Sequence, residues 1–247
     1  MAGPDLSIVL PALNERGKVA GDVLAAAEFL LGQGLSGEVI VVDDGSTDGT
    51  AAAAEGAPVP PGVDLRVIRH ERNHGKGRAV RTGVLASRGE HVLFADCGLC
   101  VPFADALPGL DLIRSGRCEI AHGSRWHRAS LVVRRRGLYR RAVSRLGRRL
   151  ARCLAGTPAR LTDTQCGFKV YRGEVARELY AECACDGYLF DVDITLRALR
   201  RGCQIEEFPV HWRADPDSRF RPLRCAPRLL GELIAMRRAL RKTPQGQ

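Results

Sequence analysis

Apolar runs bounded by turn residues divide the first half of the chain into two kinds of segment that alternate. Short runs rich in Val, Ile and Leu are typical of buried strands, and they occupy residues 6–10, 38–42, 64–69, 91–95 and 118–122. Stretches rich in Ala and Leu with helical spacing lie between them, at residues 17–32, 48–55 and 76–87. This alternation predicts an α/β fold, a mostly parallel sheet flanked by helices.

Polar side chains follow three of these predicted strands directly. Asn14 and Glu15 follow the first strand, Asp43 and Asp44 the second, and Asp96 the fourth. In open α/β sheets ligands bind beyond the carboxyl ends of the strands, so we expect these side chains along one edge. The alternative for the "DDGSTD" stretch is a turn in which Ser46 and Asp48 cap the next helix.

Composition narrows the class of protein. The chain has 247 residues, of which 45% are hydrophobic and 27% charged, as in soluble globular domains. It has no apolar run long enough to cross a bilayer, and the N-terminus lacks the pattern of a signal peptide. Nine cysteines occur at irregular spacing. Cys97 and Cys100 form a C-x-x-C without a second pair, so we interpret the cysteines as reduced filler residues.

Positive charge is concentrated in two stretches rich in arginine. The net charge is +10, and residues 134–152 and 219–242 carry much of it. Leu146, Leu150 and Leu154 recur every four residues among the arginines, so residues 131–154 predict a basic amphipathic helix. Residues 223–247 predict a basic C-terminal helix or tail. Such segments favour an anionic membrane surface, with a separate membrane protein as a further partner.

Nucleic acid is the other partner that a basic protein can have. Aromatic residues make up only 5% of the chain, and none recur within the arginine-rich stretches as a base-stacking platform requires. No zinc-finger, RNP or helix-turn-helix pattern is present. We therefore expect no nucleic-acid binding.

Several motifs together point to one family. These are "IVLPALNER" (8–16), "VVDDGSTDGT" (41–50), "GSRW" (123–126), "DTQCGFKVY" (163–171) and "GYLFDVDITLRALRRG" (187–202). In this combination the chain resembles the GT-A glycosyltransferases of family 2, and within it the polyprenyl-phosphate glycosyltransferases of the dolichyl-phosphate β-glucosyltransferase type. The resemblance spans about residues 5–222. It implies a Rossmann-like GT-A domain over residues 1–222.

The resemblance implies a nucleotide-sugar site on the first loops. It assigns packing around base and ribose to Pro11, Ala12, Asn14 and Glu15. A uracil or ribose hydrogen bond falls to Asp43 or Asp44, with Asp44 favoured, because a carboxylate accepts from these groups. Lys76, between Gly75 and Gly77 at the start of a predicted helix, matches a diphosphate contact aided by the helix N-terminus.

The metal motif departs from the family pattern. Members have Asp-x-Asp after this strand to hold one Mg²⁺ or Mn²⁺ ion, whereas this chain has Asp96-Cys97-Gly98. Three interpretations remain open. Asp96, the diphosphate and waters suffice; Asp191 or Asp193 completes the metal shell; or the chain is a weak or inactive relative. We expect Asp96→Ala to abolish turnover and Gly98→Asp to preserve or raise it.

The resemblance also implies an acceptor side. Arg125 matches a residue that grips the acceptor phosphate, with further contributions from Gln165, Lys169, Arg136 and Arg140. Asp191 and Asp193 match catalytic acidic positions, and Asp193 is the favoured one. The alternative for both is a carboxylate in a first helical turn, stabilised by the helix dipole.

The implied activity is inverting transfer of a hexose to a polyprenyl phosphate at the cytosolic membrane face. UDP-glucose is the expected donor and GDP-mannose the second choice. A phosphate monoester is largely ionised at pH 7, with a second pKa of about 6, and so needs no strong general base. Two alternatives remain: a catalytically weak relative that serves as a binding scaffold, and an acceptor without phosphate, which would need Asp191 or Asp193 as base.

Overall fold

A computed structural model describes residues 3–134, 158, 160–214, 231, 232 and 236. Its centre is a seven-stranded sheet of order β3-β2-β1-β4-β7-β5-β8. All neighbours are parallel except β7, which runs antiparallel to β4 and β5. The strands are β1 Leu6–Ala12, β2 Gly37–Asp43, β3 Val63–Arg69, β4 His91–Ala95, β5 Ile120–Ser124, β7 Phe168–Arg172 and β8 Ile205–Pro209.

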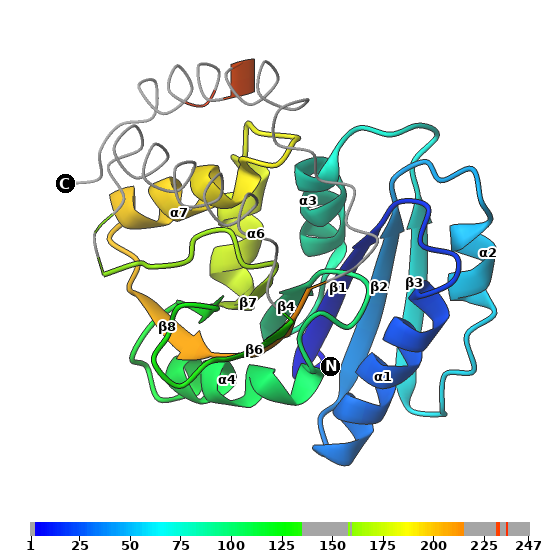
Figure 1. Cartoon of the computed structure of the whole chain (residues 1–247), viewed down its shortest axis with the longest axis horizontal. Coiled ribbons are helices and arrows are strands. Elements are labelled where there is room, and N and C mark those ends of the chain that lie inside the picture. Colours follow the sequence, from blue (N-terminus) through cyan, green and yellow to red (C-terminus); the bar gives the residue numbers. More distant parts are fainter. Residues whose placement is uncertain (1–2, 135–157, 159, 215–230, 233–235, 237–247) are drawn as a thin grey trace.

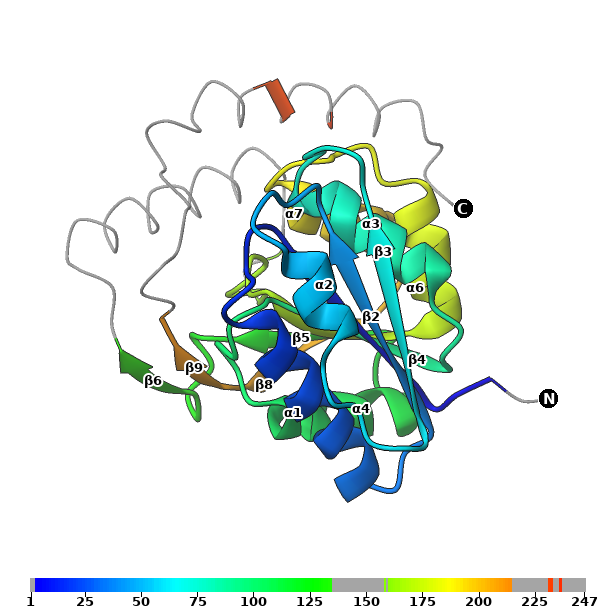
Figure 2. The same ribbon diagram turned by 90° about the vertical axis from the view of Figure 1, so that its right-hand side faces the viewer.

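Helices cover both faces of this sheet (Figures 1 and 2). One face carries α1 (Val19–Gly32), α2 (Thr50–Glu55), the 3₁₀ helix η1 (Phe103–Ala106) and α4 (Leu107–Arg114). The other face carries α3 (Lys76–Ala86), α6 (Gly173–Ala181) and α7 (Phe190–Arg200). The prediction of a Rossmann-like, mostly parallel sheet flanked by helices is confirmed.

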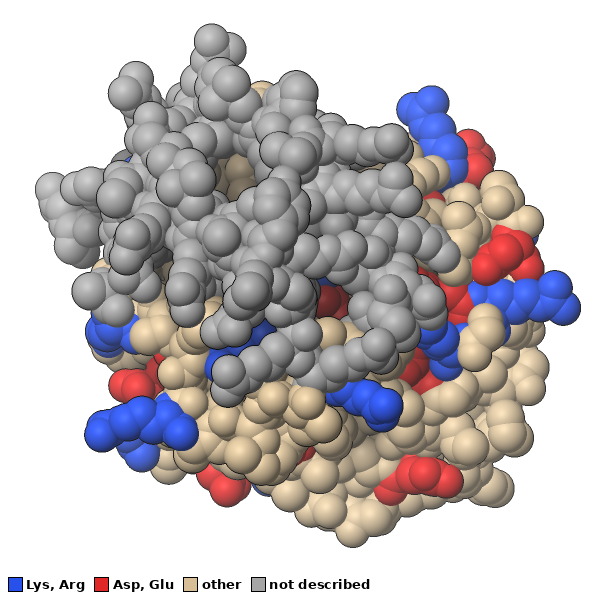
Figure 3. All heavy atoms as spheres, viewed as in Figure 1, with Lys and Arg blue, Asp and Glu red and all other residues tan. Residues whose placement is uncertain are grey.

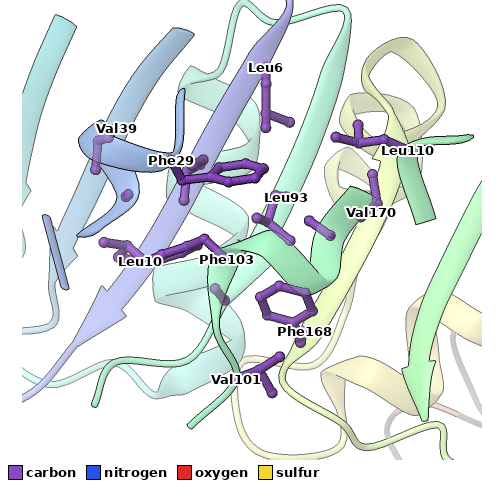
Figure 4. Packing of buried hydrophobic residues seen from close by; sticks show 14 of the residues in the cluster. Leu6, Leu10, Phe29, Val39, Leu93, Val101, Phe103, Leu110, Phe168 and Val170 are labelled. Atoms are coloured by element: carbon purple, nitrogen blue, oxygen red, sulfur yellow. The ribbon is translucent and has the colours of Figure 1, made fainter. Parts of the chain in front are cut away.

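Side chains of β1 alternate between two hydrophobic cores, as the period of a strand requires. Leu6, Ile8 and Leu10 are fully buried on the face of α1, and Val9 is fully buried on the face of α3. Figure 4 shows the first core, where Phe29 of α1 packs beside Phe103 with ring centroids 6.4 Å apart. Because both faces are covered, β1, β2 and β4 are buried and mostly apolar, which is why the sequence pattern predicts them.

The register of the parallel strands brings their carboxyl ends to one edge of the sheet. Ala12 at the end of β1 pairs with Asp43 at the end of β2, and Val9 pairs with Phe94 near the end of β4. The predicted edge of polar residues is therefore present, with Asn14, Asp44 and Asp96 each just past a strand.

The arginine-rich segments are only partly described. Leu131 and Val132 lie in strand β6 (Leu131–Arg134), which pairs with β9 (His211–Arg213), so the predicted helix does not include them. The rest of residues 131–154, with Arg136 and Arg140, lies outside the described residues. Of the predicted C-terminal helix, Met236 is buried against Val192 and Leu196 of α7. Within the described part of the chain, no helix is long and apolar enough to span a bilayer.

Candidate active site

The loops after β1 and β2 are locked together by hydrogen bonds. The backbone N–H of Asn14 donates to the Ser46 hydroxyl at 2.7 Å, and the Thr47 N–H returns a bond to the Asn14 side chain at 2.9 Å. Asn14 has a φ of +50°, a left-handed conformation that Asn tolerates better than most residues. The Glu15 N–H donates to the Thr50 hydroxyl at 2.8 Å. Asn14 and Glu15 thus shape this edge, next to half-buried Pro11 and buried Ala12.

Asp44 differs from its predicted role as a nucleotide contact. It is 3% exposed, and its oxygens accept the N–H groups of His74 at 3.0 Å and Gly75 at 2.8 Å. The His70 ring lies 2.8 Å from the same carboxylate. With its oxygens engaged by the protein, Asp44 holds the loop before α3 instead of facing a ligand.

Asp43, the other acid of this pair, has one carboxylate oxygen without a hydrogen bond to a described residue. Its Oδ1 accepts the Ser46 N–H at 2.9 Å, whereas its Oδ2 has no hydrogen-bond partner among the described residues. The exposed Arg69 lies 3.7 Å away as an ion-pair partner. Nearby, Asp48 accepts the N–H of Thr50 at 3.0 Å, but the N-cap of α2 is Gly49 without a side-chain cap, and Ser46 is bonded to Asn14, so the capping interpretation is not confirmed.

The start of α3 brings Lys76 to the site, but its backbone amides are already used. The N–H groups of Gly77 and Arg78 donate to the carbonyls of Gly187 at 3.2 Å and Asp186 at 3.1 Å. A Cβ on Gly77 would lie 2.5 Å from the Cys185 carbonyl oxygen, so only glycine allows this close contact. The predicted diphosphate contact therefore rests on the Lys76 side chain, without those two amides.

Three ion pairs gather beyond the end of β4. The Nζ of Lys76 lies 2.7 Å from Oδ1 of Asp96, and the Nζ of Lys169 lies 2.5 Å from Oδ1 of Asp191. Arg125 holds Asp163 with two bonds, Nε to Oδ2 at 2.6 Å and Nη2 to Oδ1 at 2.7 Å. Lys76 and Asp96 are partly exposed, with 27% and 34% of their side-chain surface accessible.

The charges of this cluster act on one another. Burial by itself lowers the pKa of Lys76, but the carboxylates of Asp96 and Asp191 more than offset this and raise it. Burial raises the pKa of Asp191, against the opposing effect of Lys169 and Lys76. Burial would also raise the pKa of Asp163, yet Arg125 lowers it. Lys76 and Asp163 therefore stay charged at neutral pH.

The two acids of α7 face different ways. Asp191 belongs to the cluster just described. Asp193 is 0% exposed, pairs with Arg197 at 2.8 Å and accepts the Ala184 N–H at 2.8 Å. The preference for Asp193 as catalytic acid stays a prediction, and its full burial and its bonds to Arg197 and Ala184 favour Asp191 instead. Asp191 is the member of the pair that the structure places at the site.

The predicted acceptor residues are only partly in reach of a ligand. Arg125 retains 17% side-chain exposure and stacks on Trp212, with its guanidinium 5.5 Å from the ring centroid. Lys169 is fully buried and donates to the Cys166 carbonyl at 2.6 Å, so its predicted phosphate contact does not fit; it supports Asp191 instead. Gln165 is exposed. Arg136 and Arg140 lie outside the described residues.

Two important acids were missed by the sequence analysis. Asp163 was read as part of a motif without a role of its own, although it is fully buried and fixes Arg125. Asp22 of α1 has no role in the sequence analysis, yet its carboxylate accepts hydrogen bonds from the loop after Asp96. The sequence signal for Asp22 would have been an acidic residue at a helical position that is expected to face the core.

The residues present leave one carboxylate for a metal ion. Oδ1 of Asp96 is buried and has the ammonium group of Lys76, 2.7 Å away, as its ion-pair partner. A Cβ on Gly167 would lie 2.1 Å from Asp96 Oδ2, so this glycine makes room for the carboxylate. In the described part of the chain no group of three or more His, Cys, Asp or Glu could hold an ion. The donor set thus fits a cation bound mainly by the diphosphate and Asp96.

The cysteines of this loop do not replace the missing acid. Cys97 and Cys100 are free thiols, like the other cysteines in the residues that the structure describes. Burial raises the pKa of Cys97 well above its usual value, so it remains a neutral thiol and a poor ligand for a hard cation.

The backbone conformation at position 98 favours glycine. Its φ is +99°, a conformation that residues with a side chain rarely adopt. An aspartate here would be strained, so the expectation that Gly98→Asp preserves or raises turnover is withdrawn.

Comparisons with known proteins agree with this fold and site. The family model described as "Glycosyl transferase family 2" matches residues 7–180. A dolichyl-phosphate β-glucosyltransferase of Dictyostelium discoideum is 30% identical over 94% of this chain and 73% of its own length. The corresponding protein of Saccharomyces cerevisiae is 32% identical over 84% of this chain and 66% of its own length.

A solved structure has the same fold. The glucosyl-3-phosphoglycerate synthase of Mycobacterium tuberculosis, crystallised with Mn²⁺, UDP and phosphoglyceric acid, matches with a TM-score of 0.69 and 23% identity. The match covers 98% of this chain and 80% of that one. The fold and the acidic edge define a glycosyltransferase of the GT-A type. The chain belongs to glycosyltransferase family 2.

Proposed function

We propose that this protein is an inverting glycosyltransferase that transfers glucose from UDP-glucose to the phosphate of a polyprenyl phosphate at the cytosolic membrane face. The observation that carries the proposal is the cluster of ion pairs beyond β4. It presents two partly exposed cations, Lys76 paired with Asp96 and Arg125 paired with Asp163. Two anionic groups, the donor diphosphate and the acceptor phosphate, have to be held close together in this reaction. The relatives named dolichyl-phosphate β-glucosyltransferases support glucose as the transferred sugar and a polyprenyl phosphate as the acceptor.

The residues suit an acceptor that is already a nucleophile. Asp193 is paired with Arg197 and Asp191 with Lys169, so neither of these two acids is free to act as a general base. A phosphate monoester with a second pKa of about 6 attacks without one. The protein's tasks are then alignment of the two substrates and stabilisation of charge on the leaving diphosphate.

Each cation has a separate task in this mechanism. Lys76 contacts the diphosphate and stabilises the charge that grows on it as the glycosidic bond breaks. Arg125, fixed by Asp163, orients the acceptor phosphate for attack from the opposite side, which inverts the anomeric carbon. Asp96 would hold a single Mg²⁺ or Mn²⁺ ion, which would neutralise part of the diphosphate charge. Asp43, with Oδ2 to spare, accepts a hydrogen bond from the base or ribose.

A transfer assay tests this proposal. The purified chain is incubated with radiolabelled UDP-glucose or GDP-mannose, a polyprenyl phosphate and Mn²⁺, and label in the organic phase is counted. We expect transfer from UDP-glucose, a β-linked product, and loss of transfer in the Asp96→Ala variant. An α-linked product would contradict inversion, and label reaching only a non-phosphorylated polyprenol would contradict the acceptor.

A second function is favoured by Gly98, which takes the place of an acid in the metal motif. In this case the chain binds nucleotide sugar or lipid phosphate as a scaffold without catalysis. Binding of UDP without transfer from any donor would support the scaffold and overturn the enzyme.

A further inference from the structure

Asp22 is a buried carboxylate that makes no ion pair with any described residue. It lies in the first turn of α1 and is 2% exposed. Burial of a carboxylate costs free energy unless polar groups compensate it. Its oxygens face the loop after β4: Oδ2 accepts the Gly98 N–H at 2.8 Å and Oδ1 accepts the Leu99 N–H at 3.0 Å. One side chain therefore binds two successive amides of the loop that follows Asp96.

That loop has an unusual backbone. Gly98 and Leu99 both have positive φ, +99° and +46°. A leucine in the left-handed region is strained, and such a conformation persists only when its surroundings enforce it. Leu99 is 44% exposed, so packing of its side chain does not enforce it. The hydrogen bonds that Asp22 accepts from the Gly98 and Leu99 N–H groups hold this backbone, next to residues 97, 100 and 101, which pack on the core.

The helix dipole does not account for this placement. A carboxylate in a first turn is favoured near the helix N-terminus, but it gains this effect equally well on the surface. Asp22 is instead turned inward and binds a loop 76 and 77 residues further along the chain. Burial also raises its pKa to about 6, so the position is costly for the charged form that accepts these bonds best.

Asp96 depends on the same loop. Its backbone N–H is fixed to the Gly167 carbonyl at 2.8 Å, and its side chain lies against Gly167 and Lys76. On the other side, the Cys100 carbonyl accepts the Arg213 N–H of β9 at 2.8 Å. Between these two anchors, the bonds to Asp22 are the ones that set the path of residues 98 and 99.

We propose that Asp22 is a positioning residue for donor binding, which clamps Gly98 and Leu99 and so fixes Asp96 beside Lys76. On this basis Gly98 and Asp22 are matched: the glycine permits a backbone turn that the carboxylate holds. In the family motif the second acid lies within this loop. In this chain the acid comes from α1, and its carboxylate binds the backbone of the loop. The inference rests on the proposed function, since it requires a nucleotide diphosphate as ligand.

Asp22→Asn is the direct test, because the amide has one oxygen for two N–H donors. UDP affinity with Mn²⁺ is measured by calorimetry, the KM and kcat for UDP-glucose by the transfer assay, and Tm by calorimetric scanning. We expect UDP affinity to fall about 10- to 100-fold, the range for loss of a hydrogen bond to a charged group. The KM for UDP-glucose should rise accordingly, while the KM for the polyprenyl phosphate stays unchanged.

Glu38→Gln is the matched control. Glu38 is likewise a fully buried carboxylate and accepts the Arg88 N–H at 2.7 Å, but it lies near the start of β2, at the end of the sheet away from the site. This variant should lower Tm and leave UDP affinity unchanged. Equal UDP affinity in Asp22→Asn and Glu38→Gln would overturn the inference.

Gly98 provides a second test that does not depend on how well Asp22→Asn folds. Gly98→Ala and Gly98→Asp should each weaken UDP binding, and Gly98→Ala combined with Asp22→Asn should lose less than the sum of the two. Tighter UDP binding by Gly98→Asp would overturn the inference. Failure of the unaltered protein to bind UDP would overturn the proposed function instead.

Discussion

Lys76 and Lys169 both lie close to the Phe94 ring, but they have different roles. Their ammonium groups lie 5.5 Å and 5.8 Å from the centroid of the Phe94 ring. Two cations so close repel each other, and the carboxylates of Asp96 and Asp191 compensate this repulsion. Lys169 is fully buried, whereas Lys76 reaches the surface. Only Lys76 can exchange part of its interaction with Asp96 for a bound diphosphate.

Replacement of Lys76 by Gln tests this assignment. The variant keeps a polar side chain, one atom shorter, but loses the charge that stabilises the leaving diphosphate. We expect kcat/KM for UDP-glucose to fall about 100-fold, as for removal of a group that stabilises transition-state charge. Arg78→Gln, which removes a charge from an exposed residue two positions along α3, is the control. A similar loss in both variants would show that general charge, not Lys76, binds the donor.

Glu38 gives a prediction on pH. Burial alone would raise its pKa, but hydrogen bonds from the Ser7 hydroxyl and from Arg88 lower it below its ordinary value of 4.5. A group with a lowered folded-state pKa stabilises the protein above its unfolded pKa, and this contribution is lost as pH falls through the folded value. Urea unfolding at several pH values should therefore show the free energy of unfolding of the unaltered protein falling below about pH 4.5. Glu38→Gln should be less stable at neutral pH and lose less on acidification; parallel curves would contradict this.

The sequence points to individual charged residues of the candidate site but not to their partners. Lys76, Asp96 and Asp191 stand out because each follows a strand or opens a helix in a recognisable motif. The fixing of Arg125 by Asp163 and of Gly98 by Asp22 spans 38 and 76 residues. Such long-range contacts arise from packing of elements and leave no local pattern, so no inspection of spacing could have found them.

At the scale of elements, the site depends on how closely α3 approaches the loop before α7. Gly77 lies against the Cys185 carbonyl, and a Cβ there would also come within 2.7 Å of the Phe190 Cβ. The Gly77 and Arg78 amides are bonded to this loop, and α7 carries Asp191 just beyond it. The contact between α3 and this loop therefore sets the spacing of Lys76 and Asp191.

Gly77→Ala should separate these two elements. We expect a loss of about 1–3 kcal/mol in unfolding free energy, the usual cost of overpacking, and a lower kcat/KM for UDP-glucose. Gly21→Ala in α1 is the control, because a Cβ there meets nothing within 4 Å. It should raise stability by roughly 0.5 kcal/mol and leave turnover unchanged. Chemical denaturation with the transfer assay measures both; equal stability of the two variants would contradict the packing argument.

The first five strands were predicted from sequence to within about two residues, and four of them, β1, β2, β4 and β5, are almost entirely buried. β7 was not expected as a strand, although "FKVYR" is buried over four of its five residues. Its polar Lys169 and Arg172 interrupt the apolar pattern. The antiparallel direction of β7 follows from its connections to later elements and has no signature in the local sequence.

At the scale of the molecule, charge is unevenly shared between the described body and the arginine-rich segments. On the face seen in Figure 3, acidic and basic side chains of the described residues are interspersed. The sequence places long runs of arginine in residues 134–152 and 219–242, and the whole chain carries a net charge of +10. Attraction to an anionic membrane would then depend on those runs and not on the body, and this remains a prediction.

Vesicle binding with charge-matched variants tests it. Replacing Arg148 and Arg149 by Gln removes two charges from the first arginine-rich run, and replacing Arg114 and Arg117 by Gln removes two from exposed positions of the body. Each basic residue near an anionic surface contributes about 1 kcal/mol, so the first variant should bind phosphatidylglycerol vesicles about 30-fold more weakly than the unaltered protein. High salt should weaken binding because it screens these charges, and phosphatidylcholine vesicles should bind little. The second variant should bind like the unaltered protein; equal losses in both variants would mean that net charge alone governs attachment, with no dedicated membrane-facing segment.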